Sequence, residues 1–282
     1  MALIKPMIYA PLVREKFEGR IKVATLCSDL GFLANTTVGE TVTFPKWKAI
    51  GDASDVTKGT AIDVESLDQK GSTATIKQVA PKAVRIYDMD NLTAIGNAVE
   101  EAATQQAIVI ARKLDKDLIT EALTSDLMSA SAAADAITAT EVNTALSLYG
   151  DEQDTEDFAG IVINSNLLTS FLAMDEFTSV EKTYTTNGSG IIKNGTVGFF
   201  RGIPVIMTDH CTYDSTLQEY LTFVIKKGAL GYMTKRDINV EIDRQPKLFA
   251  TDIVTDMIYA VKLVNDEGIV VVRKTITDPE ES

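Results

Sequence analysis

The sequence has few of the residues from which catalytic and metal sites are built. It contains one histidine, His210, and two cysteines, Cys27 and Cys211, which do not fall in a metal-binding or redox spacing. A zinc site needs three or four ligands in separated pairs, so we expect no metal ion. The glycine-rich run 187–195 lacks the hydroxyl residue that follows the lysine of a phosphate loop, and no G-x-S-x-G motif occurs. We therefore expect no cofactor and no enzymatic activity.

Long apolar runs, a secretion signal and basic clusters are missing as well. No stretch approaches the roughly twenty apolar residues that span a bilayer, and the N-terminus lacks the apolar segment of a signal peptide. We expect a protein that is made in the cytoplasm and has no membrane partner. The formal net charge is −13, and no run of lysine and arginine exceeds two residues, which argues against a protein that reads nucleic-acid sequence.

Two unlike segments meet near residue 85. Residues 35–88 have strand-like runs but few large apolar groups, and alternation over 41–47 and 72–86 predicts two long antiparallel strands with an irregular tip. Residues 91–123 have no proline and one glycine, and their apolar stripe predicts one helix roughly 50 Å long. A two-stranded ribbon is marginal in water by itself, so we expect it to lie on a neighbouring copy of the chain.

The other segments predict an α+β protein. We expect residues 1–24 to form an arm in which Pro6 and Pro11 break regular structure, and residues 129–139 to form a spacer of small residues. Asp88 and Asp90 precede the long helix and are interpreted as its capping residues. The remaining predictions are helices at 140–149 and 167–174, a glycine-rich loop at 183–198, and strands at 159–163, 203–207, 220–225, 238–242, 253–264 and 269–273.

The order of these elements resembles the major capsid proteins of tailed bacteriophages. The resemblance rests on Lys82-Ala-Val-Arg-Ile-Tyr-Asp88, which leads from the ribbon into the long helix. It continues with Gly202-Ile-Pro-Val-Ile-Met-Thr-Asp209, which looks like the family's G-x-P-V-x-x-x-D strand. The motifs at 223–230 and 236–244, followed by Phe249 and the long strand, complete it. The resemblance covers nearly the whole chain.

The resemblance implies the Hong Kong phage-type capsid fold. Its parts here are an N-terminal arm (1–34), an extended E-loop (35–86), a peripheral domain with the long spine helix (87–135 and 230–282) and an axial domain (136–229). In such a fold the E-loop lies across the adjacent subunit, the axial loops meet at capsomer centres, and the peripheral domains meet near three-fold positions. The implied function is a structural major capsid protein that self-assembles into an icosahedral shell enclosing double-stranded DNA.

The resemblance also implies partners and a location. The partners are other copies of the chain in hexamers and pentamers, a scaffolding protein, a portal, and packaged DNA that is held non-specifically; the location is the virion. Because the chain starts at the arm, we expect a separate scaffold or a processed form. The candidate assembly residues are Trp47, Lys46, Lys48, Pro81, Arg85, Tyr184 and Lys193. Two alternatives stay open, namely an encapsulin-type nanocompartment shell and a hydrolase or nucleotide-binding enzyme built around His210.

Overall fold

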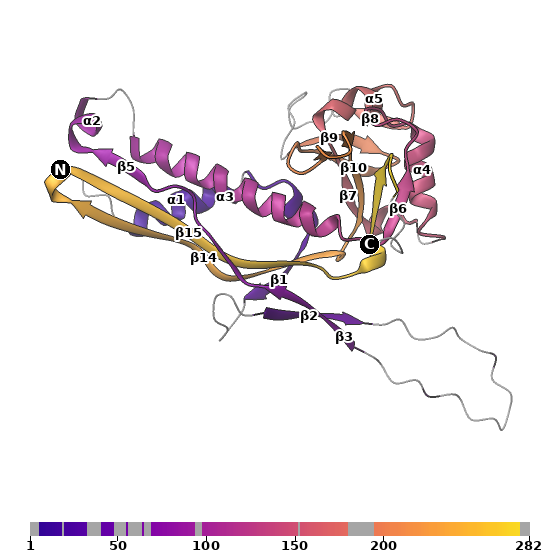
Figure 1. Cartoon of the computed structure of the whole chain (residues 1–282), viewed down its shortest axis with the longest axis horizontal. Helices are drawn as coiled ribbons and strands as arrows, with labels where there is room; N and C mark the ends of the chain where they lie inside the picture. Colours follow the sequence, from indigo (N-terminus) through magenta and orange to yellow (C-terminus); the bar gives the residue numbers. More distant parts are fainter. Residues whose placement is uncertain are drawn as a thin grey trace.

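A long helix and two long strands lie side by side at one end of the molecule, and a compact lobe lies at the other (Figure 1). The computed structural model describes residues 6–18, 20–32, 41–47, 55, 64, 69–93, 98–151, 153–179 and 195–276. A separate two-stranded ribbon lies on the side of the long strands that faces away from the long helix (Figure 1). The chain is therefore built from an extended part, a compact part and a ribbon.

The first sheet supports the extended part. Its strands are β1 (Ser28–Phe32), β14 (Leu230–Gln245), β15 (Ala250–Leu263), β4 (Lys77–Val79) and β5 (Val84–Tyr87). β14 and β15 form an antiparallel hairpin joined by the turn η5 (Pro246–Leu248), while β4 and β5 both pair with β15. The sheet is thus dominated by one long hairpin, with shorter strands along its two edges.

The long helix α3 (Ala98–Ala122) covers one face of this sheet. Buried residues recur along it at helical spacing, among them Ala103, Ile110, Leu114 and Leu118. Alternate residues of a strand point to opposite faces of a sheet. Accordingly Met257, Tyr259 and Val261 of β15 join the core under α3, whereas Ile258 and Ala260 join a separate cluster with the ribbon. The two faces of β15 therefore pack against different parts of the chain.

The compact lobe is built on a second, mixed sheet. Its strand order is β6 (Leu127–Ala130), β16 (Ile269–Arg273), β13 (Thr222–Lys226), β7 (Phe158–Ile163), β10 (Ile203–Met207), β9 (Thr196–Phe200) and β8 (Phe177–Ser179). The central strands are nearly continuous apolar runs because both of their faces are buried. One face packs toward α4 (Ala139–Ser147) and α5 (Leu168–Leu172) through residues such as Phe171, and the other continues the core under α3 through Val162 and Phe223.

The ribbon consists of β2 (Thr41–Trp47) and β3 (Gln69–Thr75), which are antiparallel with Thr41 opposite Thr75 and Trp47 opposite Gln69. Its base joins the body through five buried residues, here called the ribbon-base cluster: Phe44, Ala74, Ile76, Ile258 and Ala260. The other regular elements among the described residues are α1 (Pro6–Glu18), α2 (Asp88–Thr93), β11 (Tyr213–Asp214), β12 (Glu219–Tyr220), and the 3-10 turns η1 (Val23–Leu26), η2 (Thr155–Asp157), η3 (Ser165–Leu167) and η6 (Asp266–Gly268).

Several predictions of local structure are confirmed. The strands predicted at 203–207 and 269–273 are β10 and β16 with the predicted bounds, and the strands at 159–163 and 253–264 are β7 and β15 with slightly shifted ends. The helix predicted at 140–149 is α4. It begins at a capping box in which the side chains of Thr138 and Glu141 bond each other's backbone N–H groups.

The prediction of an irregular arm at the N-terminus is wrong for residues 6–18, which form α1. Pro6 occupies the first turn, where its missing N–H costs nothing, but Pro11 lies inside the helix. The helix nevertheless forms because Val13 and Phe17 become buried in the core under α3. Burial within the same chain thus outweighs the local cost of Pro11.

Other predicted boundaries also need correction. Part of the predicted spacer 129–139 is the end of β6, which pairs in parallel with β16, and the end of the predicted loop 183–198 is β9. The strand predicted at 238–242 is a segment of the 16-residue β14. The second ribbon strand predicted at 72–86 divides, because β3 pairs with β2 whereas β4 and β5 pair with β15. The long helix predicted at 91–123 corresponds to two helices, the end of α2 and the whole of α3, and residues 94–97 between them lie outside the described part.

Candidate assembly surfaces

The ribbon is the first candidate assembly surface. Within the described part of the chain, its strands pair only with each other and its buried contacts are confined to Phe44, Ala74 and Ile76 at the base. A two-stranded ribbon has little stability of its own in water. The five-residue cluster at its base is small beside the 29 buried residues of the core under α3. The ribbon is therefore attached at its base and gains little support from its own chain beyond it.

The segment that leads toward the ribbon is held by a buried carboxylate of α3. The Asp115 oxygens accept hydrogen bonds from the backbone N–H groups of Lys22 and Ala24, each at 3.0 Å. Burial raises the pKa of Asp115 to about 6, although these hydrogen bonds favour the charged form. Burial also raises the pKa of the neighbouring Cys27, and the charge of Asp115 raises it further. Asp115 therefore fixes η1 against the long helix.

The far end of the β14–β15 hairpin carries a group of exposed apolar side chains, here called the distal tip: Tyr87, Met89, Leu248 and Phe249. Phe249 is 71% exposed and Met89 is 69% exposed. The strand pairing brings them together, because Tyr87 lies opposite Ala250 and the Asp88 N–H donates to the Phe249 carbonyl at 2.9 Å. Such a patch is typical of a surface that another chain covers.

The backbone of Phe249 supports this interpretation. Its φ is 48°, in the left-handed region that costs a residue with a side chain about 1 kcal/mol or more. Asp88 secures the same end by pairing with Arg244, with Oδ1–Nη1 and Oδ2–Nη2 distances of 2.7 and 2.6 Å. The structure thus shows Asp88 in a cross-element ion pair, which the capping interpretation did not anticipate. The tip is held in place while its aromatic ring faces solvent.

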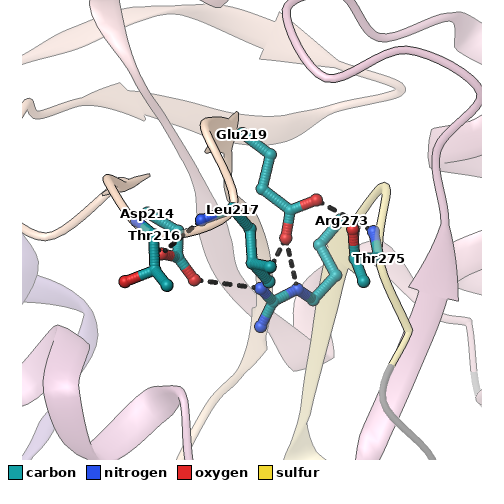
Figure 2. A network of polar contacts seen from close by, with 6 residues as sticks. All are labelled: Asp214, Thr216, Leu217, Glu219, Arg273 and Thr275. Atoms are coloured by element: carbon teal, nitrogen blue, oxygen red, sulfur yellow. Dashed lines mark hydrogen bonds and ion pairs between the residues drawn. The ribbon is translucent and has the colours of Figure 1, made fainter.

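A third candidate surface is the β11–β12 hairpin of the lobe, which a polar network fixes to β16 (Figure 2). The fully buried carboxylate of Glu219 accepts from Arg273 Nε at 2.7 Å and from the Thr275 N–H at 2.8 Å. Arg273 also pairs with Asp214, whose Oδ1 accepts from the turn N–H of Leu217 at 3.2 Å. Burial raises the pKa of Asp214, but these hydrogen bonds lower it by more, so its pKa lies below the ordinary value. The hairpin is therefore rigid.

The candidate assembly residues fall into three groups. Arg85 lies in β5 and forms a two-bond pair with Asp252 of β15, with both N–O distances 2.7 Å, so its side chain is engaged within the chain. Pro81 is half-buried between β4 and β5. The backbones of Lys46 and Trp47 belong to β2, but their side chains lie outside the described part, as do Lys48, Tyr184 and Lys193 entirely. Of the seven candidate side chains, the structure therefore describes those of Pro81 and Arg85.

Among the described residues, the His210 side chain forms no hydrogen bond with a serine, cysteine or acidic side chain. Asp209 Oδ1 accepts from the Ser165 N–H at 2.9 Å, and burial together with the charges of Arg112 and Lys22 lowers the pKa of His210. Within the described residues no group of histidine, cysteine or acidic side chains could hold a metal ion. None of the helices in that part of the chain combines the length and apolar character needed to cross a bilayer.

Comparison with known proteins assigns the architecture. No protein-family model matches the chain. The chain is 26% identical over 271 residues to the major capsid protein of Staphylococcus phage phiMR11, covering 96% of this chain and 93% of that protein. The capsid structure of cyanophage P-SCSP1u matches with a TM-score of 0.58 over 88% of each chain, at 16% identity. The mature capsid of bacteriophage PhiM1 matches with a TM-score of 0.58 over 91% of this chain and 86% of its own, at 11% identity.

The chain is similar in sequence and in fold to the capsid proteins of tailed phages. The Hong Kong phage-type fold predicted from the order of its elements is confirmed by the match to phage capsid structures. The relatives are structural proteins, so the comparisons favour a capsid protein over both the hydrolase and the nanocompartment alternatives. For a capsid protein the functional site is its set of contact surfaces, and the ribbon and the distal tip are the two that the chain leaves least covered.

Proposed function

We propose that this capsid protein is the major head protein of a tailed phage and that its copies assemble into an icosahedral shell around double-stranded DNA. The observation that carries the proposal is the ribbon, which is anchored through five buried residues and lies away from the core under α3. A ribbon of this kind becomes stable when it packs on a second subunit. The similarity to the phage phiMR11 major capsid protein over nearly the whole chain supports the same function.

The assignment of parts follows from this proposal. Residues 1–34 would be the arm, 35–86 the E-loop, 87–135 with 230–282 the peripheral domain, and 136–229 the axial domain. We propose that the E-loop side chains Lys46, Trp47 and Lys48 contact the adjacent subunit, that Pro81 and Arg85 form the base of the loop, and that Tyr184 and Lys193 lie near capsomer centres. Copies of the chain in hexamers and pentamers, a scaffolding protein, a portal and packaged DNA are the proposed partners. Synthesis in the bacterial host cytoplasm is part of the same proposal.

Shortening the ribbon tests the proposal directly. Residues 45–71 are replaced by an Asn-Gly turn, so that Phe44 and Ser72, which lie opposite each other, flank a two-residue hairpin connection and Phe44, Ala74 and Ile76 stay in place. We expect a folded subunit with a cooperative unfolding transition that forms no shells, measured by light scattering and negative-stain electron microscopy. A matched control carries Gln105→Ala and Thr120→Ala on the exposed side of α3 and should assemble normally. Normal shells from the shortened ribbon, or an unfolded subunit, would contradict the proposal.

The distal tip allows a test in which folding and assembly respond in opposite directions. Phe249→Gly removes the left-handed strain and should leave the isolated subunit at least as stable, by up to about 1 kcal/mol. It also removes the exposed ring, so the subunit concentration needed for shell formation should rise. Gln218→Gly is the control, because Gln218 is exposed and has a φ of 53° in the β11–β12 hairpin. If both glycine variants assemble like the unmodified chain, the tip is not an assembly contact.

A further inference from the structure

The C-terminal half of α3 carries exposed cations in a chain whose net charge is −13. Arg112 and Lys116 lie about one turn apart on the exposed side of the helix, and neither forms an ion pair with any residue that the structure describes. Lys113, which lies between them, differs because its ammonium pairs with Asp117 at 2.6 Å. The charges of Arg112 and Lys116 are therefore not neutralised within the described part of the chain.

A third cation, Lys22, lies beside the loop that follows β10. Lys22 Nζ donates to the Met207 carbonyl at 2.9 Å, and Thr120 Oγ1 lies 4.0 Å from Cys211 Sγ. These two contacts place the loop at 208–211 against the C-terminal half of α3. One bond to a carbonyl leaves two N–H donors of the Lys22 ammonium for another acceptor.

The charged side chains around this loop shift the pKa of His210. Burial lowers the pKa of His210, and the positive charges of Arg112, Lys22 and Lys116 lower it further, so the imidazole is neutral at pH 7. Asp209 is the opposing charge, and one of its oxygens already accepts a hydrogen bond from the first N–H of η3. Asp115, which is bonded to the backbone of Lys22, is a second carboxylate nearby, so three cations face two engaged carboxylates and the site is net positive. Lys22, Arg112 and Lys116 are called the α3 basic cluster below.

We propose that the α3 basic cluster binds backbone phosphates of the packaged double-stranded DNA, an inference that rests on the function proposed above. A duplex carries about one negative charge per 1.7 Å of its axis, and Arg112 and Lys116 are about 6 Å apart along α3. Any stretch of duplex therefore presents several phosphates across the cluster, whatever its sequence. An acidic peptide would need a run of carboxylates at matching spacing to do the same.

The placement of the cluster suits a contact that persists after assembly. Arg112 and Lys116 lie on α3 and Lys22 is bonded to it, whereas the ribbon packs on the opposite face of the first sheet, so a ribbon that binds a neighbour does not have to cover the cluster. Because the chain as a whole carries a net charge of −13, the contact is expected to be weak for one subunit and additive over many copies.

The test measures binding of a fluorescently labelled duplex of about 20 base pairs and mixed sequence to unassembled subunits, by anisotropy between about 50 and 200 mM salt. The variant is Arg112→Gln with Lys116→Gln. The control is Lys77→Gln with Lys82→Gln, which removes the same charge from exposed positions in and beside β4. We expect the cluster variant to bind about tenfold or more weakly at the lowest salt and its log–log salt slope to shrink by about 2. The control should keep the original slope.

Three results would overturn the proposal. Equal losses in both variants would indicate a general effect of net charge, and unchanged binding in the cluster variant would place the contact elsewhere. Displacement of the labelled duplex by poly-glutamate at a lower concentration of negative charge than unlabelled duplex requires would identify an acidic peptide as the ligand.

Electron microscopy separates this inference from the proposed function: a cluster variant that still forms shells but has lost DNA binding supports both. Absence of shells from the unmodified chain would contradict the proposed function and leave the DNA-binding comparison readable.

Discussion

Two adjacent residues of β15, Ile258 and Tyr259, lie in very different surroundings. Tyr259 faces α3, is fully buried and donates a hydrogen bond to Asp117 at 2.8 Å. Ile258 faces the ribbon and belongs to the five-residue ribbon-base cluster. Because hydrophobic stabilisation grows with the apolar area removed from water, the α3 face holds the subunit together. The ribbon face contributes much less within one chain, which is what a surface completed by a neighbouring chain requires.

The largest effect is expected on the α3 face. Leu114→Ala should lower the free energy of unfolding by about 3 kcal/mol, because Leu114 is 1% exposed and its removal leaves a cavity in the main core. Urea unfolding of unassembled subunits measures the change. Val109→Ala is the control on the same helix, since Val109 is 47% exposed and should change stability little. Equal losses at the two positions would show that α3 is not packed on one face as described.

A smaller effect on stability is expected on the ribbon face. Ile258→Ala should cost about 1–2 kcal/mol, less than Leu114→Ala, because few neighbours surround the cavity and they can close it. Shell formation should be impaired more than this loss explains, because the base of the ribbon would no longer be held at one angle. Val254→Ala, on the same face of β15 but partly exposed, is the control. A loss as large as that of Leu114→Ala would remove the distinction between the two faces.

The sequence predicts some of the helices and strands and misses others. Periodicity identifies α3, β7, β10, β15 and β16, because long apolar stripes and runs depend on burial that the residues themselves encode. It does not identify the α1 helix, β6 or β9. Their residues are small, or include proline or glycine. The first two become regular through contacts with α3 and β16, which are distant in the chain, and β9 through pairing with the adjacent β10. Tertiary packing decides such segments against their local preference.

The candidate surfaces were predictable in part. The ribbon is visible in the sequence as alternation without large apolar residues, but the distal tip is not. Phe249 and Met89 come together only through the pairing of β5 with β15. Asp115 offered a signal that sequence reasoning missed, since a carboxylate between Ala111 and Leu118 on the apolar side of a helix needs a polar partner. That partner, the backbone of η1, cannot be found from spacing alone.

Asp115 gives a pH-dependent test of the α3 face. Its folded pKa of about 6 lies above its ordinary value of 3.8, so the folded state binds the proton more readily. The contribution of this group to the free energy of unfolding should therefore be greatest below about pH 4 and decline as the pH rises through about 6. Relative to Asp115→Asn, the unmodified chain should gain roughly 1 kcal/mol between about pH 7.5 and pH 5. Parallel pH profiles for the two proteins, measured by urea unfolding, would contradict this account.

The smallest effect is expected at Arg85, which lies at the edge strand β5. Its guanidinium pairs with Asp252, and this hydrogen bond is the main reason that the pKa of Asp252 is lowered. Both groups are reached by solvent, which screens their attraction, so Arg85→Gln should barely change the unfolding midpoint. The small contribution of the pair to the free energy of unfolding should be present above about pH 4 and disappear as the pH falls and Asp252 takes up a proton.

Shell formation tests whether Arg85 also acts between subunits. If Arg85 acts only within its own chain, shells should form from Arg85→Gln as readily as from Lys77→Gln, a charge-matched control on the neighbouring β4. A loss of shells from Arg85→Gln, with unfolding unchanged, would instead make Arg85 a contact between subunits.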